Sequence, residues 1–381
     1  MRIAIMAGSI PSTTFIDALV NGMAEQGYTM VVIGKRRSNY QYNPGVECLE
    51  VPQQKIAQLF FVLRLLRYAS WAQLRSIYAA ANSFQQFFYD LLFYLPIFKS
   101  QPDRVHIQWA ATLYNRALLF DLFPHKILLS LRGAHINYTP IIKPEIGEYY
   151  KQVFPRVHKF HAVSKAMALV AKSLGADEDR IQTIYTCIND DILQSPITAK
   201  KEQSALQLIA VGRFHWVKGY QILMDALGAL KERGMAFKLL LIAEGEIPEE
   251  INYAIHQYNM HENITIIGKL SHQAVIKHLE ESDLLLLPSV NEGIANVVVE
   301  AMAVGTPVLS SNCGGMTEVI ENGVNGLLFE NRNSKHLAEQ LVVFSALNWE
   351  VRFAMARKAK ATVQLNFTRD RMLNQYKHFY S

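Results

Sequence analysis

Cysteine is scarce in this sequence of 381 residues. The three cysteines, Cys48, Cys187 and Cys313, lie far apart along the chain. This spacing provides neither a disulfide framework nor the paired ligands of a structural zinc site. We therefore expect a reducing compartment, the cytoplasm.

Long hydrophobic runs are missing as well. The stretch that comes closest to a membrane span, FFYDLLFYLPIF at 87–98, is too short and contains Asp90 and Pro96. The opening MRIAIMAGSIP has an apolar run that is too short for a signal peptide, and no cleavage pattern follows it. We therefore expect neither a secretory leader nor a membrane-spanning helix.

The chain also lacks a strong excess of positive or negative charge. The chain has 38 Lys and Arg against 33 Asp and Glu, a formal net charge of +5. This small excess predicts no nucleic-acid partner, but it is compatible with an anionic ligand or an anionic membrane surface. With 50% hydrophobic and 19% charged residues, a chain of this length is expected to form two globular domains.

What the sequence does contain is two series of short apolar runs that alternate with helical patterns. Continuous apolar runs are typical of parallel strands covered on both faces, and their alternation with helices predicts an α/β fold with doubly wound sheets. The first series is IAIMAG, MVVIG, RVHIQW, KILLSLRG and KFHAVS, and the second is LQLIAVGRF, FKLLLIAEG, ITIIGKL, DLLLLPS, TPVLSSN and NGLLF.

A polar segment without periodicity, 187–206, separates the two series and is the expected linker. We place an N-terminal domain at 1–195 and a C-terminal domain at 196–365. Two such domains facing each other would form a cleft outside the carboxyl ends of their strands, where ligands of these sheets usually bind.

The loop VGRFHWVKG, residues 211–219, carries two cations after a predicted strand. Arg213 and Lys218 follow the strand end at Gly212. Cations at the carboxyl end of a parallel strand suit a diphosphate, and an arginine can bind two of its oxygens at once. The alternative is that both are ordinary surface charges. The sequence of this loop alone does not decide between the two interpretations.

The stretch PSVNEGIANVVVEAMAVGTPVLSSNCGG, beginning at Pro288, places Glu292 and Glu300 around the expected start of a helix. Residues 293–296 would lie at its N-terminus, whose free N–H groups and dipole attract phosphate. If all eight steps were helical, the carboxylates would lie about 12 Å apart along the axis, which suits two ends of one ligand. The alternative is that they complement the helix dipole, an effect worth under about 1 kcal/mol. That account explains neither the glutamate in a tight turn nor the GTPVLSSNCGG that follows.

These motifs, in their order and spacing, resemble the family-4 retaining glycosyltransferases. The resemblance is dense over 206–330, where VGRF…KG, IAEGE and IIGKLSHQAVIKHLEESDLLLLPS precede the E-x7-E signature at Glu292 and Glu300. Over the N-terminal half it is only a faint match of pattern. It implies the GT-B fold, in which two Rossmann-like domains with parallel sheets face each other across a cleft.

The resemblance implies a role for each matching residue. Arg213 and Lys218 would hold the donor diphosphate and stabilise its charge as it leaves. Glu292 would bind hydroxyls of the transferred sugar, and Glu300 the nucleotide ribose. Ala295 stands where many members have a second glycine, and its methyl group should narrow the phosphate loop slightly. Further donor contacts are implied for Gly212, Glu244, Gly268, Gly293, Ile294, Ala295 and Asn296.

The N-terminal half departs from the family pattern. Many members have a glycine-rich loop after the first strand and a histidine before a glycine in a later one. This chain has only Gly8–Ser9 in the first place, Arg132 in the second, and His135 where an acid is frequent. Gly8 is therefore expected to contact the donor, and Arg132 or His135 to face the donor sugar as catalytic candidates. The alternative, that both merely close a strand end, stays open.

No metal and no cofactor are expected, because the nucleotide sugar is a co-substrate. The sequence DEDR at 177–180 has Asp-x-Asp spacing, but it lies in a polar turn, where carboxylates are usually just solvated. In the resembled family, cations of the protein handle the leaving diphosphate instead of a metal.

Residues 55–100 combine cations with an apolar stripe. One hypothesis is a basic amphipathic surface on anionic lipid, which would make the protein peripheral on the inner face of the membrane. The other is that the stripe is the core face of a helix. The cations are Lys55, Arg64, Arg67, Arg75 and Lys99, against the single acid Asp90, and Ile56, Leu59, Phe60, Leu63 and Leu66 recur at helical spacing.

The C-terminal FTRDRMLNQYKHFY predicts a helix with Phe367, Met372, Tyr376 and Phe379 on or near one face. The resemblance implies that this segment, 366–381, crosses back to pack on the N-terminal domain.

Together, the motifs and the resemblance predict a retaining glycosyltransferase of the hexosyltransferase type that serves polysaccharide biosynthesis. It would move a sugar from a UDP- or GDP-linked donor to a saccharide, lipid-linked or other hydroxyl acceptor. Two alternatives remain: a nucleotide-sugar epimerase or phosphorylase of the same fold, and a non-catalytic nucleotide-sugar binder. Donor consumption with and without acceptors would separate them.

Overall fold

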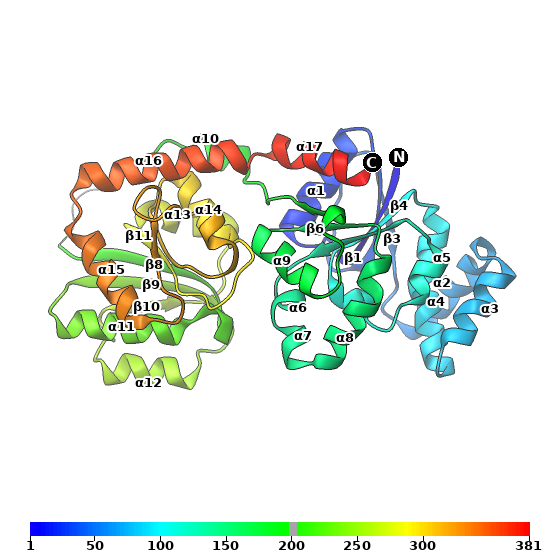
Figure 1. The fold of residues 1–381 in the computed structure, drawn as a ribbon, viewed down its shortest axis with the longest axis horizontal. Coiled ribbons are helices and arrows are strands. Elements are labelled where there is room, and N and C mark those ends of the chain that lie inside the picture. Colours follow the sequence, from blue (N-terminus) through cyan, green and yellow to red (C-terminus); the bar gives the residue numbers. More distant parts are fainter. Residues whose placement is uncertain (198–203) are drawn as a thin grey trace. The chain divides into compact units, whose positions relative to one another are not determined.

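A computed structural model describes residues 1–197 and 204–381 and divides the chain into two compact units (Figure 1). The first unit contains Met1–Ile184 together with Leu373–Ser381, and the second contains Tyr185–Met372. The units therefore divide before the boundary placed at 195. Of the expected linker, 187–206, residues 198–203 lie outside the described part of the chain.

The first unit is built on a parallel sheet with the strand order β3-β2-β1-β4-β5-β6-β7. Its described strands are β1 (Arg2–Ile10), β2 (Thr29–Arg36), β3 (Val46–Glu50), β4 (Arg104–Ile107), β5 (Ile127–Leu131), β6 (Lys159–Ala162) and β7 (Ile181–Thr183). Its helices are α1 (Thr14–Glu25), α2 (Lys55–Leu65), α3 (Trp71–Ala80), α4 (Phe84–Ser100), α5 (Leu118–Leu122), α6 (Ala134–Asn137), α7 (Thr139–Ile142), α8 (Pro144–Val153) and α9 (Lys165–Ser173).

The second unit repeats this architecture with the strand order β10-β9-β8-β11-β12-β13, again parallel. Its described strands are β8 (Leu206–Arg213), β9 (Phe237–Glu244), β10 (Ile264–Ile267), β11 (Leu284–Leu287), β12 (Val308–Ser311) and β13 (Leu327–Phe329). Its helices are α10 (Asp190–Gln194), α11 (Tyr220–Glu232), α12 (Glu249–Gln257), α13 (His272–Glu281), α14 (Asn296–Val304), α15 (Ser334–Ala346) and α16 (Trp349–Asn366), and α17 (Arg369–Tyr380) follows.

The apolar runs form strands because helices cover both faces of each sheet. In β11 all four residues are leucine and all are buried. In β8, Leu208 packs in the core on one face of the sheet, and its neighbour Ile209 packs in the core on the other. Figure 1 shows α11 and α12 on one side of this sheet and α13 and α14 on the other. Every run taken as a strand in the sequence became one.

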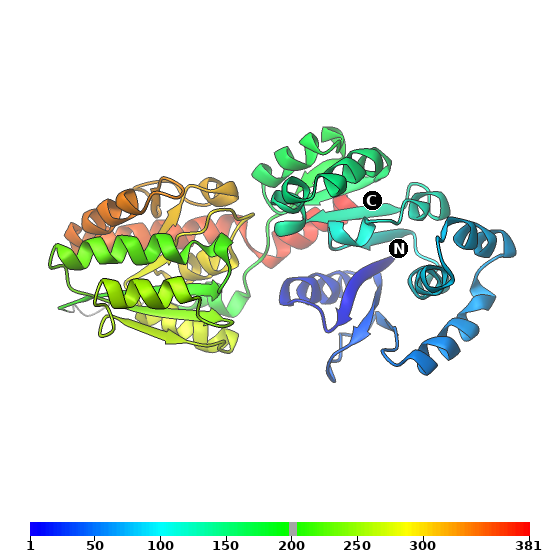
Figure 2. The same ribbon diagram turned by 90° about the horizontal axis from the view of Figure 1, so that it is seen from below.

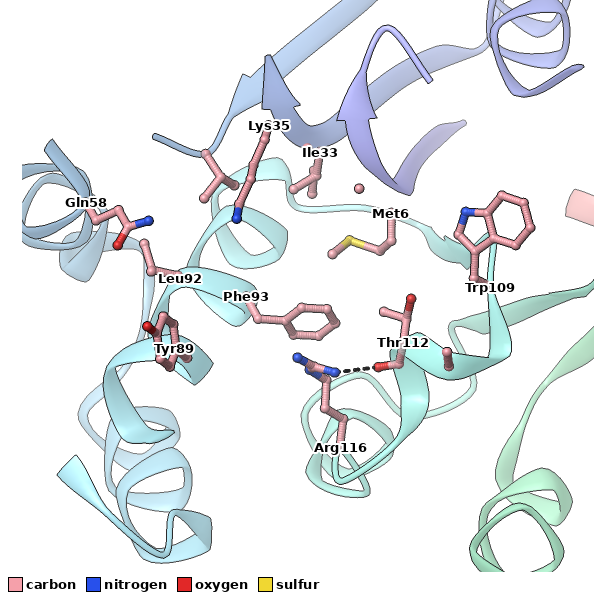
Figure 3. Close-up of a pocket in the computed structure, with 14 residues that line it drawn as sticks. Met6, Ile33, Lys35, Gln58, Tyr89, Leu92, Phe93, Trp109, Thr112 and Arg116 are labelled. Atoms are coloured by element: carbon pink, nitrogen blue, oxygen red, sulfur yellow. Dashed lines mark hydrogen bonds between the residues drawn. The ribbon is translucent and has the colours of Figure 1, made fainter. Parts of the chain in front are cut away.

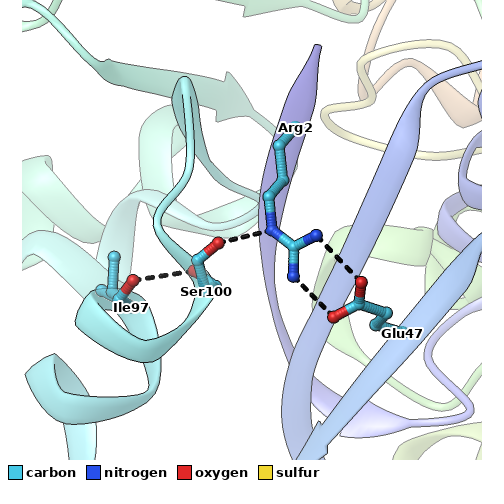
Figure 4. A network of polar contacts seen from close by, with 4 residues as sticks. All are labelled: Arg2, Glu47, Ile97 and Ser100. Atoms are coloured by element: carbon cyan, nitrogen blue, oxygen red, sulfur yellow. Dashed lines mark hydrogen bonds and ion pairs between the residues drawn. The ribbon is translucent and has the colours of Figure 1, made fainter. Parts of the chain in front are cut away.

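A polar contact fixes the edge of the first sheet (Figure 4). The Arg2 guanidinium, at the start of β1, donates to both carboxylate oxygens of Glu47 in β3 at 2.9 and 2.6 Å. Its Nε donates to the carbonyl of Ser100 at the end of α4, at 2.5 Å. The Ser100 hydroxyl in turn donates to the carbonyl of Ile97. One arginine therefore joins two strands and a helix end.

The last helix packs through the face that the sequence indicated. Phe367, Met372, Tyr376 and Phe379 are each 5% exposed or less. From Leu373 onward, α17 belongs to the first unit, so the beginning and the end of the chain share one core. None of the described helices is both long enough and apolar enough to cross a membrane.

Candidate functional site

The implied donor residues of the second unit gather at the carboxyl edge of its sheet. Strand β8 ends at Arg213, which is in register with Glu244 at the end of β9. Gly268 follows β10, and the loop with Glu292 follows β11. Because the strands are parallel and adjacent, these residues share one edge of the sheet, where ligands of such folds bind.

Lys218 and Glu292 form the centre of this edge. The Lys218 Nζ lies 2.6 Å from the Glu292 Oε1, and the two side chains are only 20% and 16% exposed. The Ser289 hydroxyl donates to the same carboxylate oxygen at 2.9 Å. The sequence assigned Lys218 to the diphosphate and Glu292 to the sugar, and the structure brings the two groups into direct contact.

Two glycines let the surrounding loops approach each other. Gly219 is left-handed (φ +65), and a Cβ there would lie 2.0 Å from the Pro288 carbonyl oxygen. Gly314 (φ +50), in the NCGG loop, would place a Cβ 1.8 Å from the carbonyl oxygen of Glu292. A side chain at either position would displace backbone, so these glycines hold the segments of Lys218 and Glu292 in place.

Helix α14 begins at Asn296, and its N-cap, Ala295, provides no side-chain cap hydrogen bond. Only the steps from Asn296 to Glu300 are helical, so the rise between them is about 6 Å along the axis. The separation of 12 Å considered for eight helical steps therefore does not apply. Ala295 has ordinary extended backbone and is buried in an apolar cluster, together with the core face of the helix.

Glu300 is held by a histidine that the sequence did not indicate. The Nε2 of His272, at the start of α13, lies 3.0 Å from the Glu300 Oε1. This hydrogen bond raises the pKa of His272 above its usual value of 6.5, and burial opposes it. The Glu300 side chain is 15% exposed, so one of its oxygens is fixed beside the loop that follows β10.

Gly293 is buried and Ile294 partly buried, whereas three other donor candidates lie nearer to solvent. Arg213 is exposed. Glu244 is paired with Lys269 at 3.1 Å, and both side chains are at least half exposed. Gly268 has open space where a side chain would begin. These positions form an accessible rim around the partly buried Lys218 and Glu292.

Tyr220 is a second residue that sequence reasoning missed. It begins α11, is 6% exposed, and its hydroxyl has no hydrogen-bond partner among the described residues. A Cβ on Gly212 would lie 2.6 Å from this hydroxyl and 3.2 Å from the Lys218 Cε. Burial and the Glu292 charge raise the pKa of Tyr220, so the hydroxyl stays protonated. The signal in the sequence was a tyrosine directly after the KG of the cation loop.

In the first unit, Gly8 lines a cavity of about 490 Å³ at the carboxyl ends of β1 and β2 (Figure 3). Lys35 and Arg116 contribute cations, and the wall is mostly apolar, with Phe93 and Trp109 among its side chains. The Arg116 guanidinium lies 4.5 Å from the Phe93 ring centroid and donates to the Thr112 carbonyl at 2.8 Å. The cavity therefore combines an apolar wall with two cationic groups.

Arg132 and His135 lie beside this cavity and not in its wall. The Arg132 guanidinium is 4.3 Å from the centroid of Phe15, which packs edge-on against Trp109. His135 packs edge-on against Trp109, with 6.1 Å between the two ring centroids. Burial lowers the pKa of both Arg132 and His135. The two catalytic candidates thus share one aromatic cluster.

The acidic turn 177–180 is occupied by ion pairs. Arg180 lies 3.3 Å from Asp177, and Lys172 lies 2.6 Å from Glu178. The Asp177 carboxylate also accepts the backbone N–H of Asp179. Among residues 1–197 and 204–381, no group of three or more metal-ligating side chains of the His, Cys, Asp or Glu type gathers.

Two family models match successive parts of the chain. The model described as Glycosyltransferase Family 4 matches residues 12–192, and Glycosyl transferases group 1 matches residues 194–362. The putative colanic acid biosynthesis glycosyltransferase WcaL of Escherichia coli is 30% identical over 250 residues, 64% of this chain and 59% of WcaL. The amylovoran biosynthesis glycosyltransferase AmsK of Erwinia amylovora is 26% identical over 269 residues, 69% of this chain and 66% of AmsK. The matched region thus spans under two thirds of either relative.

Solved structures share the fold along the whole chain. A sucrose-phosphate synthase from Thermosynechococcus elongatus superimposes with a TM-score of 0.78 at 15% identity, covering 100% of this chain and 98% of that one. HepE of Anabaena, in complex with UDP-glucose, gives 0.71 at 16% identity, covering 99% and 98%. At these identities the likeness concerns the fold alone, and it confirms the expected GT-B class.

Proposed function

Because this chain belongs to the group 1 and family 4 glycosyltransferases, we propose that it transfers a sugar from a nucleotide-sugar donor to a hydroxyl acceptor with retention at the anomeric carbon. Among the first relatives are enzymes named for the biosynthesis of colanic acid and amylovoran, which supports a role in polysaccharide biosynthesis. The acceptor is accordingly a saccharide or a lipid-linked saccharide.

The contact between Lys218 and Glu292 is the observation that carries the proposal. An ammonium group suits a diphosphate, and a carboxylate suits paired sugar hydroxyls. The two groups lie 2.6 Å apart, so a donor can contact both where its sugar is joined to its diphosphate. Arg213 and the N–H groups of 293–296 would bind the remaining diphosphate oxygens. Glu300 would bind the ribose, beside His272, and the base would lie near Glu244 and Gly268.

The solved neighbours support a UDP-linked donor. HepE is described in complexes with UDP and with UDP-glucose, and TarM of S. aureus in a complex with UDP. The first-unit candidates Gly8, Arg132 and His135 belong to the same proposal, as groups that contact the donor sugar or the acceptor. GDP-linked donors are the competing class, and a larger thermal shift with a GDP-sugar than with a UDP-sugar would favour them.

Transfer on one face of the sugar accounts for retention without a protein nucleophile. The acceptor oxygen bonds to the anomeric carbon, the bond from that carbon to the diphosphate breaks, and the acceptor proton passes to a diphosphate oxygen. Lys218 and Arg213 stabilise the charge on the leaving group, as preorganised cations do in a site of low water content. The protein therefore supplies by itself the positive charge that a divalent metal would otherwise provide.

Further parts of the proposal concern place and partners. We infer a cytoplasmic protein that meets an anionic membrane surface through residues 55–100. The cationic residues of this segment are the support for that partner.

A thermal-shift experiment tests the donor site. A nucleotide sugar at about 100 times its dissociation constant should add roughly 2.7 kcal/mol of stability. We expect UDP-sugars to produce this shift, and Lys218→Ala and Glu300→Ala each to abolish it. Lys335→Ala, an exposed cation on α15, is the matched control and should keep the shift. If both site variants shift like the parent protein, the donor binds elsewhere.

Product analysis tests the reaction. With a UDP-sugar and a panel of saccharide acceptors, the product should carry the anomeric configuration of the donor, measured from the proton coupling in NMR. An inverted anomer would end the retaining mechanism. Consumption of donor without any acceptor would indicate an epimerase or hydrolase, and binding without consumption a non-catalytic binder.

A further inference from the structure

The outer face of α2 is apolar and open to solvent. Ile56, Leu59, Phe60 and Leu63 follow the spacing of one helical face, and each is between 48% and 74% exposed. The opposite side of the same helix is buried against α4 by Phe61, Val62 and Leu65. The structure therefore rules out the core-face interpretation for these four residues, because a different side of α2 packs into the core.

The apolar surface continues onto α3 and the start of α4. Trp71 is 82% exposed, Tyr78 66% and Phe84 78%. Tyr78 and Phe84 both pack around Phe87, with ring centroids 5.3 and 6.4 Å from it, so they belong to one cluster. Figure 2 shows the segment from α2 to α3 at the edge of the first unit. We define the docking face as Ile56, Leu59, Phe60, Leu63, Trp71, Tyr78 and Phe84.

The segment that carries the docking face also carries exposed cations, and it contains no acid. Lys55, Arg64, Arg67 and Arg75 are exposed, and none of them forms an ion pair within the described residues. No Asp or Glu occurs from residue 51 to residue 89. Several exposed large apolar side chains, together with cations that form no ion pair, are the composition of a helix that lies in the interface of an anionic bilayer.

We propose that the docking face binds the surface of an anionic phospholipid bilayer. A second copy of the chain is the competing occupant. In a twofold dimer, however, the same cations would face each other across the interface, which like charges oppose. An anionic lipid surface instead provides the opposite charge to Lys55, Arg64, Arg67 and Arg75, and apolar depth for the rings and aliphatic side chains.

The cavity of the first unit is lined by two of the helices that carry the docking face. Gln58 of α2 and Tyr89 of α4 line that cavity, and Tyr89 is itself 52% exposed, so the same helices form both surfaces. Resting on the proposed function, this continuity selects the lipid-linked class among the two acceptor classes. Docking itself does not depend on it.

Flotation of the full-length protein with vesicles tests the docking. The parent protein should float with vesicles that contain phosphatidylglycerol and remain behind with phosphatidylcholine alone, and high salt should weaken the binding. No donor or acceptor is present, so the result is independent of glycosyl transfer, and the nucleotide thermal shift tests that function separately.

Variants separate the two components of the docking face. Ile56→Ser with Phe60→Ser should lower the vesicle partition constant by at least about tenfold. Arg64→Gln with Arg67→Gln should lower it by roughly fivefold for each charge and weaken the salt dependence by about half, since Lys55 and Arg75 remain. The matched controls are Leu169→Ser, on the 66% exposed leucine of α9 in the same unit, and Lys335→Gln, and both should bind like the parent.

Because the substituted side chains are exposed, the melting temperature and the nucleotide shift should stay unchanged in every variant. Equal binding of parent and variants would overturn the proposal, as would failure of the parent to bind anionic vesicles at low salt. A parent dimer in solution that Phe60→Ser converts to monomer would also overturn it, because a second copy would then cover the face.

Discussion

Individual side chains around Lys218 are held by more contacts than the sequence motifs indicate. Glu292 accepts from both Lys218 and Ser289, so its carboxylate is oriented before any ligand arrives. Tyr220 differs from these three residues, because its hydroxyl is buried beside Gly212 and has no hydrogen-bond partner among the described residues. A buried hydroxyl without a hydrogen bond costs about 1–3 kcal/mol, so a ligand that accepts from it recovers that cost on binding.

Tyr220→Phe should therefore act on binding and not on folding. We expect the affinity for UDP to fall roughly tenfold, since a hydrogen bond to a charged group contributes about 1.5–3 kcal/mol. The stability of the unliganded protein should stay the same or rise slightly, because the unpaired hydroxyl is gone. Calorimetric titration with UDP and thermal unfolding without ligand measure the two effects. Tyr253→Phe, on a 67% exposed side chain of α12, is the control. Lower stability with unchanged affinity would show that the hydroxyl serves only the fold.

Among the elements, α17 is attached to the first sheet by buried polar contacts. His161 of β6 lies 3.0 Å from the Tyr376 hydroxyl and 2.8 Å from the hydroxyl of Ser130 in β5. Ser130 is also 2.8 Å from His106 of β4, whose other ring nitrogen lies 2.9 Å from the Tyr380 hydroxyl. Each of these five side chains is 2% exposed or less. A continuous chain of hydrogen bonds thus replaces purely apolar packing under the helix.

This buried network predicts a loss of stability in mild acid. Burial lowers the pKa of His161 to about 3 and that of His106 well below 6.5, so both are neutral in the folded protein. In the unfolded chain both take up protons near pH 6.5. Stability is therefore fully present above that pH and falls as the pH decreases from about 6.5 towards 3.

The free energy of unfolding should fall by about 4 kcal/mol between pH 8 and pH 5, about half from each histidine. Urea unfolding across this range, followed by circular dichroism, measures it. His161→Gln removes one titrating group, so its slope with pH should be about half that of the parent. A free energy that stays level down to pH 5 would contradict the assignment of neutral, buried imidazoles.

At the scale of the whole molecule, the sequence predicts those parts whose stabilisation is local or follows a regular period. The central strands could be predicted because strands covered on both faces, such as β11, are continuous apolar runs, and in β5 only Ser130 interrupts the run. The edge strand β3 was missed because its burial is irregular and its sequence, VECLE, carries two glutamates. The open face of α2 could not be assigned, because periodicity identifies a stripe but not what covers it.

The site shows the same limit. The cation loop and the E-x7-E stretch could be found because each is contiguous in sequence. The pairing of Glu300 with His272 and the position of Tyr220 under Gly212 depend on how separate loops meet at the sheet edge. Such contacts have no spacing along the chain that would reveal them. The roles of Gly8, Arg132 and His135 stay predictions.

The return of the chain's end to the first unit has a consequence for stability as a whole. Leu373, Tyr376, Phe379 and Tyr380 are each 2% exposed or less, and removing one buried aromatic side chain costs about 3–5 kcal/mol. The sum over these four side chains, about 11–20 kcal/mol, is as large as the 5–15 kcal/mol that stabilises a typical domain. A chain that ends at Met372 should therefore lose the folded first unit and keep the second.

Differential scanning calorimetry measures this, because two separate cores should unfold in two transitions. UDP should raise the transition of the second unit in both the parent and the shortened chain, while the other transition disappears from the shortened chain. Phe379→Ala should lower the melting temperature of the first unit by roughly 10 °C, since 1 kcal/mol corresponds to about 2–4 °C in a unit of this size. Removal of the exposed Ser381 alone is the control and should change little. A shortened chain that keeps both transitions would mean that the first unit folds without its last helix.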